Sequence, residues 1–125
     1  MDNRDILLYL NSIFAERAAV FGLFDLNIEL NDIMNMDKVS LKKLNLFPDA
    51  IINKIVNDDK EAIVYKIKEK LNKIDADFMT FLDEDFPSRL LFIDDPPYLL
   101  FYKGKIIDDD ENSVAIVGAR KSSSY

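Results

Sequence analysis

The stretch "SVAIVGARKSSSY", Ser113–Tyr125, joins an apolar run to a basic, serine-rich end. The β-branched run predicts a strand buried on both faces, as in parallel sheets. Gly118 suits a strand end where the backbone approaches a ligand closely. Arg120 can bind phosphate through a bidentate fork and Lys121 as a point charge. Taken alone, a buried strand followed by a solvated polar tail is the simpler interpretation, because neither G-x-G-x-x-G nor G-x-x-x-x-G-K-[ST] is present.

The composition narrows the class of protein. The chain has 125 residues, enough for one domain, or for a small domain and part of another. It contains no Cys and no His, which removes disulfides, thiolate metal sites and the commonest general base. Without a membrane-length apolar run or a signal peptide, a cytoplasmic setting is expected.

The net charge is −7, but the charge is unevenly distributed. Residues 75–111 hold 11 acidic and 3 basic residues, whereas residues 1–74 hold 12 acidic and 11 basic residues. This balance argues against non-specific nucleic-acid binding by the surface as a whole. An anion site would therefore be local, and the basic end of the chain is the place to expect it.

Residues 1–74 are predicted to form a helical domain. Asp2 is a candidate N-cap for a first helix that runs to Gly22 as its C-cap. Further helices are predicted over 26–34, from a cap at Ser40 to before Pro48, from Pro48 to 58, and over the amphipathic segment 59–74. Short helices joined by short loops predict a compact five-helix module.

Residues 75–125 change in character. Strands are predicted at Phe78–Phe81, at Tyr98–Tyr102 and in "SVAIVG", with a turn or short helix in "FPSRLLFI". The dipeptide Pro96–Pro97 predicts a rigid, extended entry to the second strand. The fold class expected is α+β, with the domain boundary between residues 74 and 75.

Three other groups of side chains each have an ordinary explanation. Lysines at positions 66, 70 and 73 could follow a DNA backbone, but a solvated helix face that includes Glu69 is the commoner case. The acidic residues at 83–85 and 94–95 suit turns better than metal binding or acid–base chemistry. Most of the aromatic residues between 78 and 102 are expected in the core, although some could stack on bases.

Three linked motifs resemble the DNA-processing protein A (DprA/Smf) family. They are a (Tyr/Phe)-Pro-x-x-Leu motif, an Asp-x-Pro-x-x-Leu-(Phe)-x-x-Gly motif, and a strand that ends in Gly-(Ser/Ala)-Arg. In this chain they are Phe86, Pro87, Leu90; Asp95, Pro97, Leu100, Phe101, Gly104; and Gly118, Ala119, Arg120. The order and spacing agree over about residues 77–125, and the agreement is looser over the helical part.

The resemblance implies a non-enzymatic protein that binds single-stranded DNA and loads the recombinase RecA in natural transformation and recombination. It implies a sterile-alpha-motif-like or helix-hairpin-helix-like module before the first strands of a Rossmann-like domain. The DNA-binding residues carried over are Gly118, Ala119 and Arg120, with Lys121 and Ser122 as helpers. A homodimer of the full-length protein is expected, and no catalytic residue, metal, cofactor or membrane contact.

The chain also departs from the family pattern. Where relatives carry a glycine-rich "PGLG" hairpin, it has "IFAERAA", so the helical module is not expected to grip DNA through a hairpin. The Rossmann-like domain of the family is much longer, so the chain is expected to be the N-terminal part of a longer protein and to bind DNA weakly by itself.

Two other functions stay open at this point. A phosphoribohydrolase-type enzyme also holds phosphate at a glycine turn after a strand, but it would need further glycines and a catalytic acid. The helical domain could instead be a protein-interaction module, which its nearly neutral charge favours.

Overall fold

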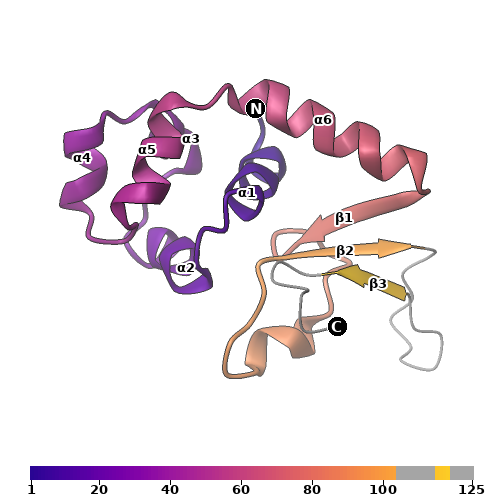
Figure 1. Ribbon diagram of the computed structural model, residues 1–125. Coiled ribbons are helices and arrows are strands. Elements are labelled where there is room, and N and C mark those ends of the chain that lie inside the picture. The colour runs from indigo at the N-terminus through magenta and orange to yellow at the C-terminus, as the bar shows by residue number, and fades with distance from the viewer. Residues whose placement is uncertain (104–114, 119–125) are drawn as a thin grey trace. The chain divides into compact units, whose positions relative to one another are not determined.

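The computed structural model describes residues 1–103 and the backbone of 115–118, and it divides the chain into two units, Met1–Val64 and Tyr65–Tyr125 (Figure 1). The expected α+β class is confirmed. The described elements are α1 (Asn3–Ser12), α2 (Arg17–Asp25), α3 (Leu30–Asn35), α4 (Lys38–Lys43), α5 (Asp49–Asn57), α6 (Lys60–Lys73), β1 (Ala76–Thr80), the 3-10 helix η1 (Ser88–Phe92), β2 (Leu99–Lys103) and β3 (Ala115–Gly118). The division between the units lies within α6, and the sequence-based boundary at residues 74 and 75 stays a prediction.

The core of the first unit is built from apolar faces of short helices. In α1, the five consecutive side chains of Ile6–Leu10 are fully buried, so this part of the helix faces solvent on no side. In α5, Ile51, Ile52 and Ile55 are buried and the residues between them are exposed, the pattern of an amphipathic helix. Helices this short depend on such packing, because isolated helices of their length are marginal in water.

The end of the first helix differs from the prediction. Asp2 is its N-cap, as expected, and its Oδ1 accepts a hydrogen bond of 2.8 Å from the Asp5 amide. The helix nevertheless ends at Ser12, because Phe14 takes the left-handed conformation with φ 64°. The amide of Phe14 donates to the Asn11 carbonyl and that of Ala15 to the Leu10 carbonyl, which together form a Schellman motif without glycine. The predicted five-helix module is therefore wrong, and the described residues of this part contain six helices.

Gly22 is not a C-cap but lies inside α2. A Cβ at this position would lie 2.8 Å from Cδ2 of Leu46, so the glycine allows the loop after α4 to pack closely. The helix ends at Asp25, and Asn27, the residue after its C-cap, has φ 58° and donates its amide to the Phe24 carbonyl. Asn is the usual substitute for Gly in this conformation.

The cap of α4 also differs from the prediction. Asp37, not Ser40, is the N-cap, and its Oδ1 accepts a hydrogen bond of 2.8 Å from the Ser40 amide. This bond, followed by a side-chain bond from the same serine, holds the pKa of Asp37 below its ordinary value.

Three strands form an antiparallel sheet in the order β1-β2-β3. The strand in "SVAIVG" is confirmed as β3, but the expectation of a parallel strand is wrong for the described pairing. Only residues 104–114 connect β2 to β3, whereas parallel neighbours need a crossover of about a dozen residues or more, usually with a helix. The short helix expected in "FPSRLLFI" is η1, and the first two strands lie within a residue or two of their predicted bounds.

Candidate nucleic-acid interface

Gly118 is the last residue of β3, at the point where the sequence predicts a phosphate-binding turn. It pairs with Phe101 of β2, whereas Ile116 pairs with Tyr102, so Val117 is the extra residue of a β-bulge. Bulges often lie next to functional sites, where they redirect the strand. Of the five predicted DNA-binding residues, the structure places the backbone of Gly118, and residues 119–122 lie outside the described part.

The direction of β3 is set by the same pairing. Because the strand runs antiparallel to β2 and its last residue pairs with Phe101, it runs toward the N-terminal end of β2. Phe101 in turn pairs with Phe78 of β1, so Phe78, Phe101 and Gly118 form one row across the sheet. A residue without a side chain thus ends the row beside two aromatic residues.

The other two sequence motifs serve the core of this unit. Phe86 and Leu100 form a buried cluster with Met79 of β1, and Leu90 of η1 packs against it. Residues from two of the three motifs are therefore joined in space and hold η1 against the sheet. Tyr98, which precedes β2, is also buried, and its carbonyl accepts a hydrogen bond of 3.1 Å from the Phe81 amide.

Asp83 closes the turn after β1. Its Oδ2 accepts a hydrogen bond of 2.8 Å from the Thr80 amide, and its own amide donates to the Thr80 carbonyl at 2.9 Å. The Thr80 hydroxyl, which is fully buried, accepts from the Leu82 amide. These bonds assign Asp83 the turn-making role that the sequence favoured over metal binding or acid–base chemistry.

The aromatic residues of this unit differ in how far their side chains are exposed. Phe78, Phe86 and Tyr98 are buried as expected, whereas Phe92 in η1 is 86% exposed. Phe92 could not be singled out from the sequence, because its exposure depends on how η1 lies against the sheet. Its flanking charges are Arg89 and the carboxylates Asp94 and Asp95, so its surroundings are not basic.

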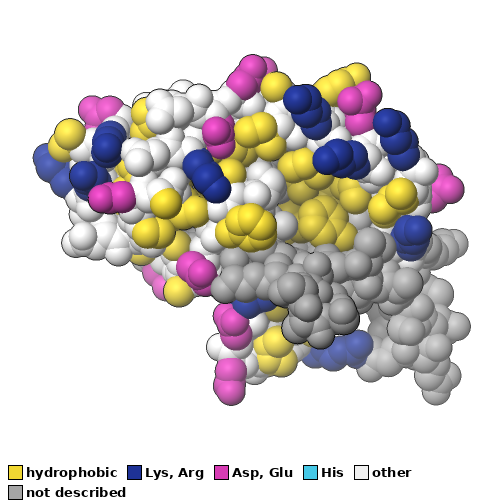
Figure 2. Space-filling model, in the orientation of Figure 1, with side chains coloured by type: hydrophobic (Ala, Val, Ile, Leu, Met, Phe, Trp, Pro, Cys, Tyr) yellow, Lys and Arg dark blue, Asp and Glu magenta, His cyan; other side chains and the backbone are white. Residues whose placement is uncertain are grey.

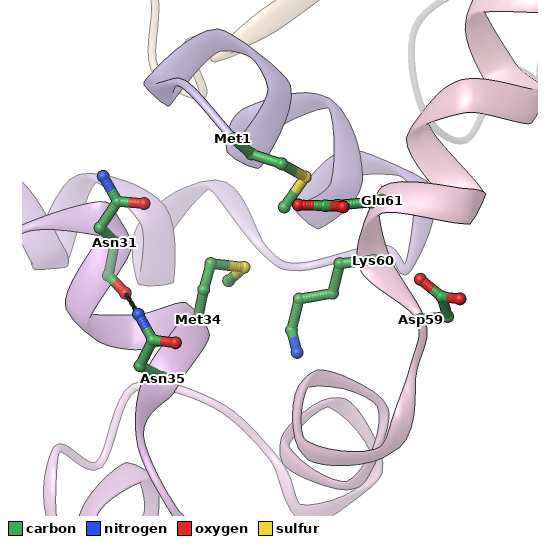
Figure 3. A pocket seen from close by; sticks show the side chains of 7 residues that line it. All are labelled: Met1, Asn31, Met34, Asn35, Asp59, Lys60 and Glu61. Atoms are coloured by element: carbon green, nitrogen blue, oxygen red, sulfur yellow. Dashed lines mark hydrogen bonds between the residues drawn. The ribbon is translucent and has the colours of Figure 1, made fainter.

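A shallow hollow of about 270 Å³ lies in the first unit, between α3 and the start of α6 (Figure 3). It is lined by Met1, Asn31, Met34, Asn35, Asp59, Lys60 and Glu61. Asn35 Nδ2 donates to the Asn31 carbonyl at 2.9 Å, and Asp59 Oδ1 accepts from the Ala62 amide, so both side chains serve the helices that carry them. Within residues 1–103 and 115–118, no three acidic, His or Cys side chains gather as metal ligands would.

The part of the chain that contains the sheet matches a known family. Residues 77–125 match the family model of DNA recombination-mediator protein A. Over these residues the chain is similar to the DprA/Smf family. The chain is also 27% identical to Protein Smf of Borreliella burgdorferi, in an alignment that covers 94% of this chain. It spans 36% of the length of that relative.

These comparisons confirm the resemblance to the DprA/Smf family that the sequence motifs indicated. No solved structure matches the chain significantly. In the part of the chain that the structure describes, no helix has both the length and the apolar character needed to cross a membrane.

Proposed function

We propose that this DprA/Smf chain is the part of a recombination mediator that contacts single-stranded DNA through the turn after β3. The observation that carries the proposal is the family match over residues 77–125, which includes a glycine at the end of a bulged strand. In this proposal the protein is not an enzyme, and the DNA it holds is passed to a RecA-type recombinase during natural transformation. A sterile-alpha-motif-like helical module, Rossmann-like strands and a homodimer belong to the same proposal.

Each residue of the turn has a role that suits its chemistry. Gly118 lets the backbone approach a phosphate, and the amides that follow donate hydrogen bonds to it. Arg120 adds a bidentate, charge-assisted contact, which is stronger than a neutral hydrogen bond. Lys121 supplies a second positive charge, and Ser122 a hydroxyl donor.

The surrounding charge favours a local contact over a broad one. The acidic residues of 75–111 repel a polyanion from much of this unit, so the basic end of the chain supplies the favourable charge. Phosphate contacts of this kind give affinity without sequence preference.

The test is to measure the binding of fluorescein-labelled oligo-dT by anisotropy over a range of salt concentrations. Arg120→Ala should weaken binding and reduce the slope of log K against log[salt] by about 0.7, the effect of losing one phosphate contact to a single strand. Arg120→Lys keeps the charge and should keep the slope while binding more weakly. An Arg120→Ala variant with the affinity and slope of the unaltered chain would refute the proposal.

A further inference from the structure

Helix α6 carries a positive charge that contrasts with the rest of the chain. Its residues 65–73 contain four lysines and one glutamate, a local balance of +3 in a chain of net charge −7. Figure 2 shows Lys side chains gathered over this helix. A local excess of this sign attracts a polyanion even when the protein as a whole is acidic.

Three of these lysines form one continuous stripe. Lys66, Lys70 and Lys73, the α6 lysine stripe, follow each other at intervals of four and three residues, which places them on one side of the helix about 6 and 4.5 Å apart along its axis. All three are exposed. Among the described residues, none of the three has a carboxylate oxygen within 4.0 Å of its Nζ atom.

Helix stability does not account for the whole stripe. Lys70 and Lys73 lie in the last turn, where positive charge is favourable to the helix dipole. Lys66 lies outside that turn, and its position four residues from Lys70 adds a like-charge repulsion. Glu69, three residues after Lys66 and four before Lys73, offsets part of this repulsion. The like-charge pair of Lys66 and Lys70 remains, and a bound anion would relieve it.

The other faces of α6 indicate which anion fits. Val64 is buried, and Ile63, Ile67 and Leu71 are half-buried, so the apolar side is not free to enter a membrane. Tyr65 is 64% exposed, and its neighbours on the helix surface are Lys68 and Glu69, so it lies to one side of the stripe and not in line with it. An exposed aromatic ring beside a basic track is the combination that binds single-stranded nucleic acid, through base stacking and phosphate contact.

We propose that the α6 lysine stripe and Tyr65 form a second contact surface for single-stranded DNA, separate from the turn after β3. The inference rests on the proposed function for the identity of the ligand. The stripe holds successive phosphates, and Tyr65 stacks on a base. The surface gives the chain affinity without sequence preference, because neither kind of contact reads base edges.

The test compares two triple variants in the oligo-dT titration. In the first, the three lysines of the stripe are replaced by Gln, which has a similar helix propensity, so the fold should be kept. In the matched control, the exposed Lys38, Lys42 and Lys43 of α4 are replaced by Gln, which lowers the net charge equally. The stripe variant should lose about 2 units of the log K against log[salt] slope, at about 0.7 for each contact, and the control should lose much less.

Tyr65→Ser should weaken binding about fivefold or more with little change in slope, because stacking depends weakly on salt. Equal slopes for the two triple variants would overturn the inference. Competition by poly-Glu as strong as that by unlabelled oligo-dT would also overturn it, since the surface would then suit an acidic protein.

The results separate the two proposals. Loss of slope in Arg120→Ala, with none beyond the control in the stripe variant, would leave the proposed function and remove the α6 surface. The reverse pattern would keep the α6 surface and remove the contact by the turn. No binding by the unaltered chain at low salt would refute both.

Discussion

Tyr9 links the first helix to the end of α5, and the strength of this link can be predicted. Its ring is fully buried, and its hydroxyl lies 2.9 Å from Asp58 Oδ2 and 3.0 Å from the Lys54 carbonyl oxygen. The hydroxyl thus donates its proton at the C-terminus of α5, where Asp58 is the C-cap. Tyr9→Phe keeps the ring and removes this bond.

The expected loss of stability is about 1–2 kcal/mol. A hydrogen bond to a charged group contributes about 1.5–3 kcal/mol, and the half-buried Asp58 regains part of this from water. In a urea titration followed by far-UV circular dichroism, the midpoint should fall by about 0.5–1 M. The matched control is Tyr65→Phe, which removes a hydroxyl from an exposed side chain and should leave the midpoint unchanged.

The same contact predicts a pH dependence. Burial, the hydrogen bond to Asp58 and the charge of Asp58 all raise the pKa of Tyr9 above its ordinary value. A folded-state pKa above the unfolded one means that the stabilisation is complete below about pH 10 and is lost as the pH rises further. The stability of the unaltered chain should therefore fall toward that of Tyr9→Phe above pH 10. An unchanged urea midpoint in Tyr9→Phe, or parallel alkaline curves for the two proteins, would refute the reasoning.

Three further predictions concern a helix cap, the sheet and a helix end, and each is read from urea midpoints. The bond from the Ser40 amide lowers the pKa of Asp37, so its cap stabilises the fold fully above the ordinary pKa of Asp and is lost as the pH falls below it. The unaltered chain should therefore lose more stability than Asp37→Asn below about pH 4, and parallel acid curves for the two proteins would contradict this. Leu100→Ala should destabilise the sheet-containing unit by about 2–5 kcal/mol, whereas Leu91→Ala, at an exposed position, should cost less than about 1 kcal/mol; similar costs would show that the cluster of Leu100 is not a core. Asn27→Ala should cost about 1–2 kcal/mol and Asn27→Gly almost nothing, because Asn27 has φ 58°; equal effects would mean that its conformation carries no strain.

Local chemistry made part of the fold predictable from the sequence. Asp2 was predicted as a cap because a short side chain before an apolar helix has few other roles. The β-branched and aromatic runs predicted all three strands, because these residue types favour strands. The motif around Phe86 was recognised by its resemblance to a family motif, and the structure shows that Phe86 and Leu90 serve the core of the sheet-containing unit.

The errors arose where distant residues decide the conformation. A bulky side chain such as Phe14 rarely takes a positive φ. The sequence around it therefore did not indicate the end of α1, and the predicted first helix was too long. Gly22 was interpreted as a cap, although its role is close contact with Leu46, more than twenty positions away in the sequence. The partner of β3 was misjudged because pairing depends on the connection and not on the apolar run itself.

The candidate site was predictable to a different degree. The sequence motif placed Gly118 at a strand end, and the structure adds the bulge that redirects this end. The exposure of Tyr65 could not be predicted from the sequence, and neither could the absence of ion pairs between the α6 lysine stripe and the described carboxylates, because both depend on what packs around the helix.

The most direct test of the central claim is to titrate the isotopically labelled chain with oligo-dT and follow the backbone amides by NMR, which detects weak binding. If the turn after β3 holds a phosphate, the amides of residues 118–122 should shift in a saturable, salt-sensitive manner, and Arg120→Ala should abolish these shifts. Saturable shifts elsewhere, with the amides of 118–122 unchanged, would contradict the account.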